Sequence, residues 1–275
     1  MTKTVLITGA SSGIGKATAI LFQQQGWQVA ATMRSPERVA QQDPEFANLE
    51  RLLMLRLDVT EPESIVQAIA TTLDKFGSID VVVNNAGYAL VGAFELTTPD
   101  QIQKQFETNV FGLMAVTRAV LPHLRQQRQG TIVNVASVGG RVTFPIYSLY
   151  HATKWAIEGF SESLQYELRP FNLKVKIIEP GPIKTDFYDR SADMSLSSEI
   201  PEYDQFAAQV MPQMLKAGEE GAAPEQVAKV IYRASTDRSR QLRYPADRNA
   251  RFLLFLRKLL PERIFTKIVQ TILIK

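Results

Sequence analysis

The chain of 275 residues opens with a strand that runs directly into a glycine-rich turn and then into a helix. Residues 4–8 (Thr-Val-Leu-Ile-Thr) form a β-branched run without alternation, which is typical of a parallel strand buried on both faces. Gly9, Gly13 and Gly15 follow, and a helical pattern covers residues 16–25. Glycines let the backbone approach an anion, and the helix N-terminus attracts it. The arrangement predicts a phosphate site and favours a bound dinucleotide; the alternative is a purely structural turn.

Strands and helices continue to alternate along the chain, which predicts an α/β fold with a doubly wound parallel sheet in one domain, residues 1–246. Thr60 is the expected N-cap of one helix, with Pro62 in its first turn. The spacing of Trp155, Ile157, Phe160 and Leu164 predicts core packing by a later helix. The expected strands are residues 4–8, 28–33, 52–57, 79–83, 131–136, 173–178 and 242–244; the expected helices are 16–25, one from 62, 99–121, 148–168 and one from 224.

Composition excludes several classes of protein. The 31 basic and 28 acidic residues leave a net charge of +3, which is too small to indicate nucleic-acid binding. The sequence has no cysteine and two histidines, so we expect neither disulfides nor a metal site. Residues 1–4 lead directly into the first strand, and no apolar run approaches the roughly 20 residues of a membrane span. We therefore expect no signal peptide and a cytoplasmic location.

The end of the second expected strand bears on the choice of cofactor. An acidic side chain at this point of a dinucleotide-binding fold holds the 2′-hydroxyl of NAD, whereas an arginine accommodates the 2′-phosphate of NADP. Met33 and Arg34 occupy the position, and neither is a carboxylate. The sequence thus favours NADP(H) over NAD(H), although a solvated arginine would need no such partner.

Tyr150 and Lys154 lie four residues apart in an expected helix, so they share one face. An ammonium beside a phenol favours the phenolate, and the pKa of the phenol should fall toward working pH. The pair can then serve as a general acid and base. In isolation, the same spacing is more typical of an exposed pair on an amphipathic helix.

Polar residues follow several of the expected strands at the edge where open α/β sheets bind ligands. Ser137 comes after the fifth strand, and Asn85 lies in the turn after the fourth. Asn85 also suits a purely structural turn. Asn109 lies in the middle of an expected helix, where an asparagine commonly faces solvent or makes a packing hydrogen bond.

Two segments remain outside this pattern. Residues 184–222 are rich in polar and small residues with scattered aromatics and methionines, which predicts a mobile lid over an apolar substrate. Residues 247–275 predict a basic amphipathic helical extension, because Ile264, Phe265, Ile268, Val269 and Ile272 form a stripe among many Lys and Arg residues. The stripe could pack on its own domain, on a second subunit or on an anionic membrane surface.

Taken together, these segments resemble the classical short-chain dehydrogenases/reductases over about residues 3–245. The motifs stand in family order: residues 8–15 (Thr-Gly-Ala-Ser-Ser-Gly-Ile-Gly), residues 84–87 (Asn-Asn-Ala-Gly), Asn109, Ser137, Tyr150 with Lys154, and Pro180-Gly181. The sequence of residues 150–154 (Tyr-His-Ala-Thr-Lys) and the presence of a C-terminal extension resemble those of the subgroup near hydroxysteroid and retinol dehydrogenases.

The resemblance implies a Rossmann-type sheet of about seven strands and a catalytic tetrad. Tyr150 would carry the proton for the substrate oxygen, Ser137 would hold that oxygen, and Lys154 would bind the nicotinamide ribose and support Tyr150. Asn109 would position a water that links Lys154 to solvent. The cofactor-binding residues that the resemblance implies are Gly9, Ser11, Ser12, Gly13, Ile14, Arg34, Asp58, Val59, Asn85, Ala86, Gly87, Tyr150, Lys154, Pro180, Gly181, Ile183 and Thr185.

Within this group, Asp58 and Val59 would contact the adenine, Asn85 and Ala86 the adenosine side, and Ile183 and Thr185 the carboxamide. The family's C-terminal region helps to form the substrate pocket and a tetramer contact, so the extension favours a homodimer. The function we expect is reversible hydride transfer between NADP(H) and an apolar alcohol or carbonyl substrate. The alternative is a non-catalytic protein that senses NADP(H) or acts as a scaffold.

Overall fold

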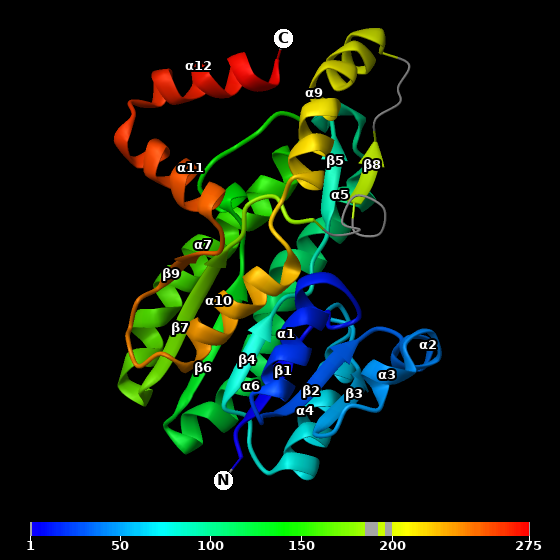
Figure 1. Ribbon diagram of the computed structural model, residues 1–275, viewed down its shortest axis with the longest axis vertical. Helices are drawn as coiled ribbons and strands as arrows, with labels where there is room; N and C mark the ends of the chain where they lie inside the picture. Colours follow the sequence, from blue (N-terminus) through cyan, green and yellow to red (C-terminus); the bar gives the residue numbers. More distant parts are fainter. Residues whose placement is uncertain (1, 185–191, 196–199, 275) are drawn as a thin grey trace.

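The computed structural model describes residues 2–184, 192–195 and 200–274, and its centre is a seven-stranded parallel sheet (Figure 1). The strand order is β3-β2-β1-β4-β6-β7-β9, so the predicted Rossmann-type architecture is confirmed. The strands are β1 (Thr4–Ile7), β2 (Gln28–Met33), β3 (Leu52–Arg56), β4 (Val81–Asn84), β6 (Gly130–Val135), β7 (Leu173–Glu179) and β9 (Arg243–Pro245).

Burial of the strands explains their apolar, non-alternating sequences. Every residue of β1, β4 and β6 is buried, whereas β3, at the edge of the sheet, is only partly so. Val5 and Ile7 belong to the core on one face, and Leu6 belongs to the core on the other. Both faces of a parallel sheet must therefore be covered by helices.

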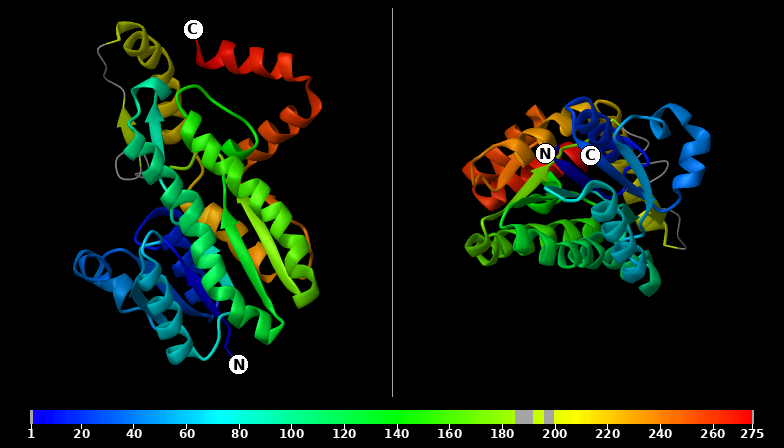
Figure 2. Two further views of the ribbon diagram at one scale, coloured as in Figure 1. Left: turned by 180° about the vertical axis from the view of Figure 1, so that it is seen from behind. Right: turned by 90° about the horizontal axis from the view of Figure 1, so that it is seen from below.

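Two layers of helices provide this cover, as the view from below shows (Figure 2). Helices α1 (Gly13–Gln24) and α10 (Pro224–Thr236) pack on one face, where Phe22 meets Trp27 and Tyr232 edge to face. The other face is covered by α4 (Pro62–Phe76), α6 (Gly112–Gln127) and α7 (Ser148–Leu168). Helices α2 (Pro36–Gln42) and α3 (Pro44–Ala47) lie near the β3 edge.

The helix expected over residues 99–121 is interrupted. Helix α5 (Pro99–Phe106) leads into a π-helical turn, η2 (Glu107–Phe111), and α6 then runs on to Gln127. A π turn adds a residue to the helix and turns a side chain inward, and such turns are common at functional sites. Asn109 lies in this turn and is buried, with 1% of its surface exposed.

Two local predictions are wrong. Thr60 does not cap α4, because Glu61 is its N-cap and Pro62 its first residue. The backbone N–H and hydroxyl of Thr60 instead donate to Asp58 Oδ1, which forms a tight turn before the helix. Trp155 is 49% exposed. The buried face of α7 contains Lys154, Ile157 and Leu164, and Trp155 lies next to Lys154 on the solvent side of that face.

A second layer of structure stands beyond the carboxyl ends of the strands. Strand β5 (Ala89–Gly92) pairs with β8 (Ala192–Ser195) in a two-stranded parallel sheet, and α9 (Pro201–Glu219) lies beside it (Figure 1). The sequence prediction placed neither β5 nor α9. Short 3₁₀ turns are η1 (Phe94–Leu96), η3 (Val138–Gly140) and η4 (Arg169–Phe171).

The C-terminal segment forms two helices, α11 (Arg248–Leu259) and α12 (Glu262–Leu273). Ala250 and Leu254 of α11 and Phe265 of α12 are buried against Val138 and Val142. The inner side of the extension therefore packs on its own chain, directly after the position of Ser137.

Candidate active site

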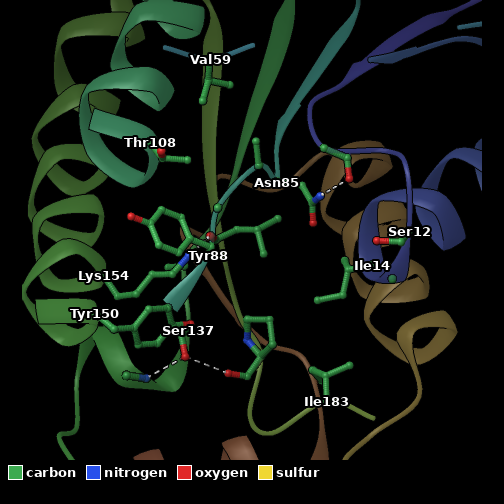
Figure 3. Close-up of a pocket in the computed structure, with 18 of the residues that line it drawn as sticks. Ser12, Ile14, Val59, Asn85, Tyr88, Thr108, Ser137, Tyr150, Lys154 and Ile183 are labelled. Carbon is green, nitrogen blue, oxygen red and sulfur yellow. Dashed lines mark hydrogen bonds between the residues drawn. The ribbon is translucent and has the colours of Figure 1, made fainter. Parts of the chain in front are cut away.

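A cavity of about 810 Å³ opens at the carboxyl ends of the central strands. It lies where the strand order reverses, since β1 leads to β2 and β3 on one side and β4 leads to β6 and β7 on the other. Open α/β sheets bind ligands at this point, because the loops diverge and leave a crevice. Figure 3 shows Ser12 and Ile14 on one side of the cavity and Tyr150 and Lys154 on the opposite side.

The glycine turn after β1 forms the first wall. Gly9 has φ +67°, and a Cβ atom there would lie 2.9 Å from Ala86 Cα. A Cβ atom on Gly15 would lie 2.6 Å from Asn85 Nδ2. Both glycines are therefore required by the close packing of this turn on residues 85 and 86, while Gly9, Ser11, Ser12, Gly13 and Ile14 line the cavity.

Asn85 ties the ends of β1 and β4 together. Its Nδ2 donates to the carbonyl oxygens of Thr8 at 3.0 Å and Gly9 at 3.1 Å, and Figure 3 draws one of these two hydrogen bonds. In return, the hydroxyl of Thr8 accepts the backbone N–H groups of Asn85 and Ala86. The predicted structural role of Asn85 is therefore present, and the residue also lines the cavity.

The far end of the cavity is polar. Arg34 is exposed at the end of β2 and lines the cavity with Asp58 and Val59. The backbone N–H of Asp58 donates to Ser64 Oγ at 3.0 Å, which anchors this loop to α4. Val59 packs so closely on α6 that a Cβ atom at Gly112 would lie 2.6 Å from its Cγ2 atom.

Tyr150 and Lys154 share one face at the start of α7, as their spacing predicts. The Lys154 Nζ atom lies 5.6 Å from the centroid of the Tyr150 ring and donates to the carbonyl oxygen of Val135 at 3.0 Å. Lys154 is buried, and burial lowers the pKa of its ammonium from 10.5 to about 8. The negative charge of Glu158 opposes that shift. A positive charge therefore lies beside the phenol below about pH 8.

Ser137 is the N-cap of η3, directly after β6. Its Oγ accepts the backbone N–H of Gly139 at 3.0 Å and lies 3.5 Å from the carbonyl oxygen of Pro180 (Figure 3). Since 3.5 Å is long for an O–H···O bond, the hydroxyl proton is weakly held there. Ser137 thus has a fixed oxygen and a proton that can turn to another acceptor.

Asn109 does not line the cavity but lies directly behind it. Its Nδ2 donates to the carbonyl oxygen of Tyr88 at 2.8 Å and to Thr153 Oγ1 at 3.1 Å, and its Oδ1 accepts the Tyr88 N–H at 3.0 Å. The Thr153 hydroxyl in turn donates to the carbonyl oxygen of Tyr150. Asn109 therefore connects the segment after β4 to the first turn of α7.

His151 has a role in the site that the sequence did not indicate. Its Nε2 accepts the backbone N–H of Phe144 at 2.9 Å, and its Nδ1 lies 2.9 Å from the carbonyl oxygen of Gly139. Burial lowers the pKa of the imidazole to about 4, so the ring is neutral near pH 7 and Nδ1 carries the donated proton. His151 therefore fixes the loop after Ser137 against α7. Its position beside Tyr150 was the only sequence signal.

Two buried carboxyl groups lie on the protein side of Lys154. Glu158 accepts from Arg243 Nε at 2.9 Å, and Glu179 accepts from Arg141 Nη1 at 3.2 Å. Among the described residues, Glu158 Oε1 and Glu179 Oε2 have no hydrogen-bond partner. Burial, helped by repulsion from Glu179, raises the pKa of Glu158 to about 7, and burial also raises the pKa of Glu179. The charge behind Lys154 therefore changes around neutral pH.

The structure brings nearly all of the predicted site residues to this one cavity. Asn109 lies behind it, as described above, and Thr185 lies outside the described residues. The predicted residues that line the cavity are Gly9, Ser11, Ser12, Gly13, Ile14, Arg34, Asp58, Val59, Asn85, Ala86, Gly87, Ser137, Tyr150, Lys154, Pro180, Gly181 and Ile183.

An apolar wall lies near Tyr150, and the sequence indicated only the part of it that belongs to residues 184–222. Phe144, Tyr147 and Met214 line the cavity there, and Met214 comes from α9. Tyr147 and Tyr150 stand edge to face, with their ring centroids 6.1 Å apart. Tyr147 is one helical turn before Tyr150, which is a spacing that could have indicated it.

The C-terminal extension is connected to the same cavity through Asp247. One carboxylate oxygen accepts the backbone N–H of Gly181 at 2.8 Å, and the other accepts that of Ala250 at 2.8 Å, which caps α11. The N-cap of α11 thus also holds the loop after β7. A Cβ atom at Gly181 would lie 3.0 Å from Asp247 Oδ2, so the contact depends on glycine.

Comparison with known proteins agrees with this geometry. Residues 3–195 match the family model described as short chain dehydrogenase. The uncharacterized oxidoreductase YusZ of Bacillus subtilis is 37% identical over 98% of this chain and 97% of its own length. The 3-ketodihydrosphingosine reductase of Bacteroides thetaiotaomicron is 39% identical over 72% of this chain and 71% of its own. Bovine (Bos taurus) retinol dehydrogenase 8 is 37% identical over 83% and 76%, respectively.

Solved structures of short-chain dehydrogenases and related reductases are also similar to this chain. A short-chain dehydrogenase from Streptomyces avermitilis has a TM-score of 0.83 at 36% identity and covers 98% of this chain and 95% of its own. ElxO, solved with NADP bound, has a TM-score of 0.76 at 28% identity, over 92% of this chain and 100% of its own. A 3-ketoacyl-(acyl-carrier-protein) reductase from Brucella melitensis, complexed with NADH, has a TM-score of 0.73 at 25% identity, over 89% and 96%. The chain belongs to the short-chain dehydrogenase family.

Proposed function

We propose that the protein is an NADP(H)-dependent oxidoreductase that interconverts an apolar alcohol with its ketone or aldehyde. The observation that carries the proposal is the convergence of Tyr150, Lys154 and Ser137 on one cavity that also contains a glycine-built helix N-terminus. Such a combination suits proton transfer on one side and an anionic cofactor on the other.

The residues of the first wall fit a dinucleotide. The absence of Cβ atoms at Gly9 and Gly15 lets the turn pack closely on Asn85 and Ala86. Ser12, Gly13 and Ile14, which line the cavity, would surround a pyrophosphate. The adenine would lie by Asp58 and Val59, the adenosine side by Asn85, Ala86 and Gly87, and the nicotinamide by Tyr150, Lys154, Pro180, Gly181, Ile183 and Thr185. When bound, the nicotinamide supplies or accepts a hydride.

Arg34 is the reason to prefer NADP(H). Its guanidinium is exposed at the end of β2 on the cavity, and no carboxylate occupies positions 33 or 34. A guanidinium recognises a phosphate through charge-assisted hydrogen bonds, whereas it offers no acceptor to a ribose hydroxyl. The relative ElxO binds NADP, while the Brucella reductase is complexed with NADH, so Arg34 carries the distinction here.

Tyr150 would donate its phenolic proton to the carbonyl oxygen of the substrate in reduction and take a proton from the alcohol in oxidation. Ser137 would donate its weakly held hydroxyl proton to the same oxygen, while Gly139 keeps the Ser137 Oγ in place. The ammonium of Lys154 would stabilise the phenolate form of Tyr150 by its charge. Asn109 would keep the first turn of α7 in position and, as the family resemblance implies, hold a water that links Lys154 to solvent.

The apolar wall points to the class of substrate. Phe144, Tyr147 and Met214 surround the space beside Tyr150, and methionine adapts to irregular apolar shapes. Met214 belongs to α9, so residues 184–222 would act as the lid over this substrate. Two relatives are named as a 3-ketodihydrosphingosine reductase and a retinol dehydrogenase. The compounds in these names are apolar, which supports an apolar substrate here.

Cofactor consumption tests the proposal. NADPH and NADH oxidation would be followed by absorbance across ketones and aldehydes from small to steroid-sized. The expected result is faster oxidation of NADPH with bulky apolar carbonyls. Tight NADPH binding without turnover on any substrate would contradict the proposal and favour a sensor of NADP(H).

Two further expectations from the sequence, a homodimer and a cytoplasmic location, stay predictions. Within the described residues, the structure contains no helix that is long and apolar enough to cross a bilayer. Light scattering of the purified protein would measure its oligomeric state.

A further inference from the structure

Helix α11 has two different faces. Its inner face is buried, since Ala250 is 1% and Leu254 6% exposed where they pack near Val138 and Val142. Its outer face contains three large apolar side chains that are exposed instead: Phe252 at 62%, Phe255 at 60% and Leu259 at 63%. Figure 1 shows α11 and α12 together at the end of the molecule opposite the N-terminus.

The three exposed side chains lie in one stripe. Residues separated by three, four or seven positions share a helix face, so Phe252, Phe255 and Leu259 are neighbours. Arg248, Arg251 and Lys258 are also exposed and belong to the same side of the helix. We call these six residues the outer face of α11.

No residue of α11 is acidic. The carboxylates nearest along the chain belong to Asp247, the N-cap, which accepts the backbone N–H groups of Gly181 and Ala250, and to Glu262, in the first turn of α12. The Glu262 carboxylate lies 3.8 Å from Arg257, which is not part of the outer face. The outer face therefore combines exposed aromatic and aliphatic side chains with cations whose charge is not neutralised by α11 itself.

We propose that the outer face of α11 is a docking surface for an anionic membrane, with the helix parallel to the bilayer plane. Phe252, Phe255 and Leu259 would enter the boundary between headgroups and acyl chains, and the cations would contact acidic headgroups. Helix α11 has 12 residues, which suits a helix that lies on a bilayer and is too short for one that spans it.

Charge decides between a membrane and a second copy of this chain. A two-fold contact places the same surface of both subunits together, so Arg248, Arg251 and Lys258 of one subunit would lie near the same three cations of the other. Such like-charge contact disfavours the pairing, whereas an anionic bilayer neutralises the same three cations. The inner face of α11 remains packed on its own chain in either case.

Vesicle sedimentation of the full chain tests this proposal. The probes are vesicles of phosphatidylcholine alone and vesicles of phosphatidylcholine mixed with phosphatidylserine. We expect binding to the mixed vesicles that weakens as salt is added, because salt screens exposed charges. Failure of the full chain to bind the mixed vesicles at low salt would overturn the proposal.

Two double variants test the apolar residues and the cations of the outer face separately. Phe252→Ser with Phe255→Ser should lower vesicle binding by about tenfold or more, because both apolar groups are lost. Arg251→Gln with Lys258→Gln should lower binding by about tenfold to mixed vesicles only. The matched control is Val66→Ser with Tyr166→Ser, two side chains that are 61% and 65% exposed on α4 and α7.

Equal binding by all of these variants would overturn the assignment to α11. Light scattering without lipid provides the second readout. If the Phe252 and Phe255 substitutions halve the mass of the protein while vesicle binding is unchanged, the outer face is a subunit contact and the proposal is wrong. NADPH binding should be the same in each variant, because none of the substituted residues lines the cavity.

Discussion

The two walls of the cavity are built from different parts of the chain. The cofactor wall, residues 9–15 and 85–87, presents backbone, and glycine is required where a Cβ atom would collide with Asn85 or Ala86. The substrate wall, formed by Phe144, Tyr147 and Met214, presents side chains from the loop before α7, from the N-cap of α7 and from α9. A backbone wall is specific in geometry and tolerates little change, whereas a wall of apolar side chains can change shape without loss of the fold.

The largest expected effect on cofactor binding follows from a Cβ atom directly behind the cofactor wall. In Gly15→Ala, the added atom would collide with the backbone carbonyl oxygen of Gly9 and lie 2.6 Å from Asn85 Nδ2, so the turn and Asn85 must move. We expect NADPH affinity to fall about tenfold to a hundredfold and stability to fall by about 1–3 kcal/mol. Fluorescence titration and thermal unfolding measure both.

Gly159→Ala is the control for that change, because a Cβ atom at Gly159 in α7 meets no atom within 4 Å. Alanine is the better helix former by about 1 kcal/mol, so this variant should be at least as stable as the parent. Unchanged NADPH affinity in Gly15→Ala would show that the cofactor wall lies elsewhere.

Arg34 tests the polar end of the same wall. Arg34→Gln removes the cation that would meet the 2′-phosphate, so the KM for NADPH should rise about tenfold while that for NADH stays constant. Arg38→Gln is the control, since Arg38 is exposed on α2 and does not line the cavity. An equal rise for both cofactors would refute the role of Arg34 in recognising a phosphate.

A substitution in the substrate wall should change KM less than one in the cofactor wall. Met214→Ala enlarges the cavity near Tyr147, so the KM for bulky carbonyl substrates should change by about threefold while that for small ones does not. Leu215→Ala is the control on the same helix, because Leu215 is 39% exposed and does not line the cavity. A similar change for small and bulky substrates would indicate that α9 acts only on stability.

The smallest effect concerns pH. The pKa of Glu158 is raised to about 7, and once ionised its charge opposes the burial that lowers the pKa of Lys154 to about 8. Glu158→Gln removes that charge, so Lys154 should become neutral at a lower pH, and the alkaline limb of the kcat profile should move to lower pH. Glu167→Gln, exposed on the same helix, should leave the profile unchanged. A shift toward higher pH would contradict this sign.

The sequence allowed the cofactor wall to be predicted because its signals are local. Gly9, Gly13 and Gly15 follow a buried strand within a few residues, and Tyr150 and Lys154 are one helical turn apart. The family resemblance implied a Rossmann-type sheet of about seven strands, and the structure gives their order. Each strand that was predicted is present to within about two residues at its ends.

The substrate wall could not be predicted in the same way, because it joins residues that are far apart in the chain. Met214 meets the Tyr147 region only through tertiary packing, and β5 pairs with a strand about a hundred residues later. Helix α9 contains Pro212, which is unusual within a helix and obscures its pattern. The π turn at Asn109 likewise leaves no local signal in the sequence.

The most direct test of the account is the turnover of Tyr150→Phe. Loss of the proton donor should lower kcat by about 10²–10⁴-fold, while NADPH affinity stays that of the parent, because the cofactor wall is untouched. Tyr147→Phe, which removes a hydroxyl from the same cavity, should cost less than about tenfold. If Tyr150→Phe retains turnover similar to the parent, Tyr150 is not the general acid and base, and the central claim is wrong.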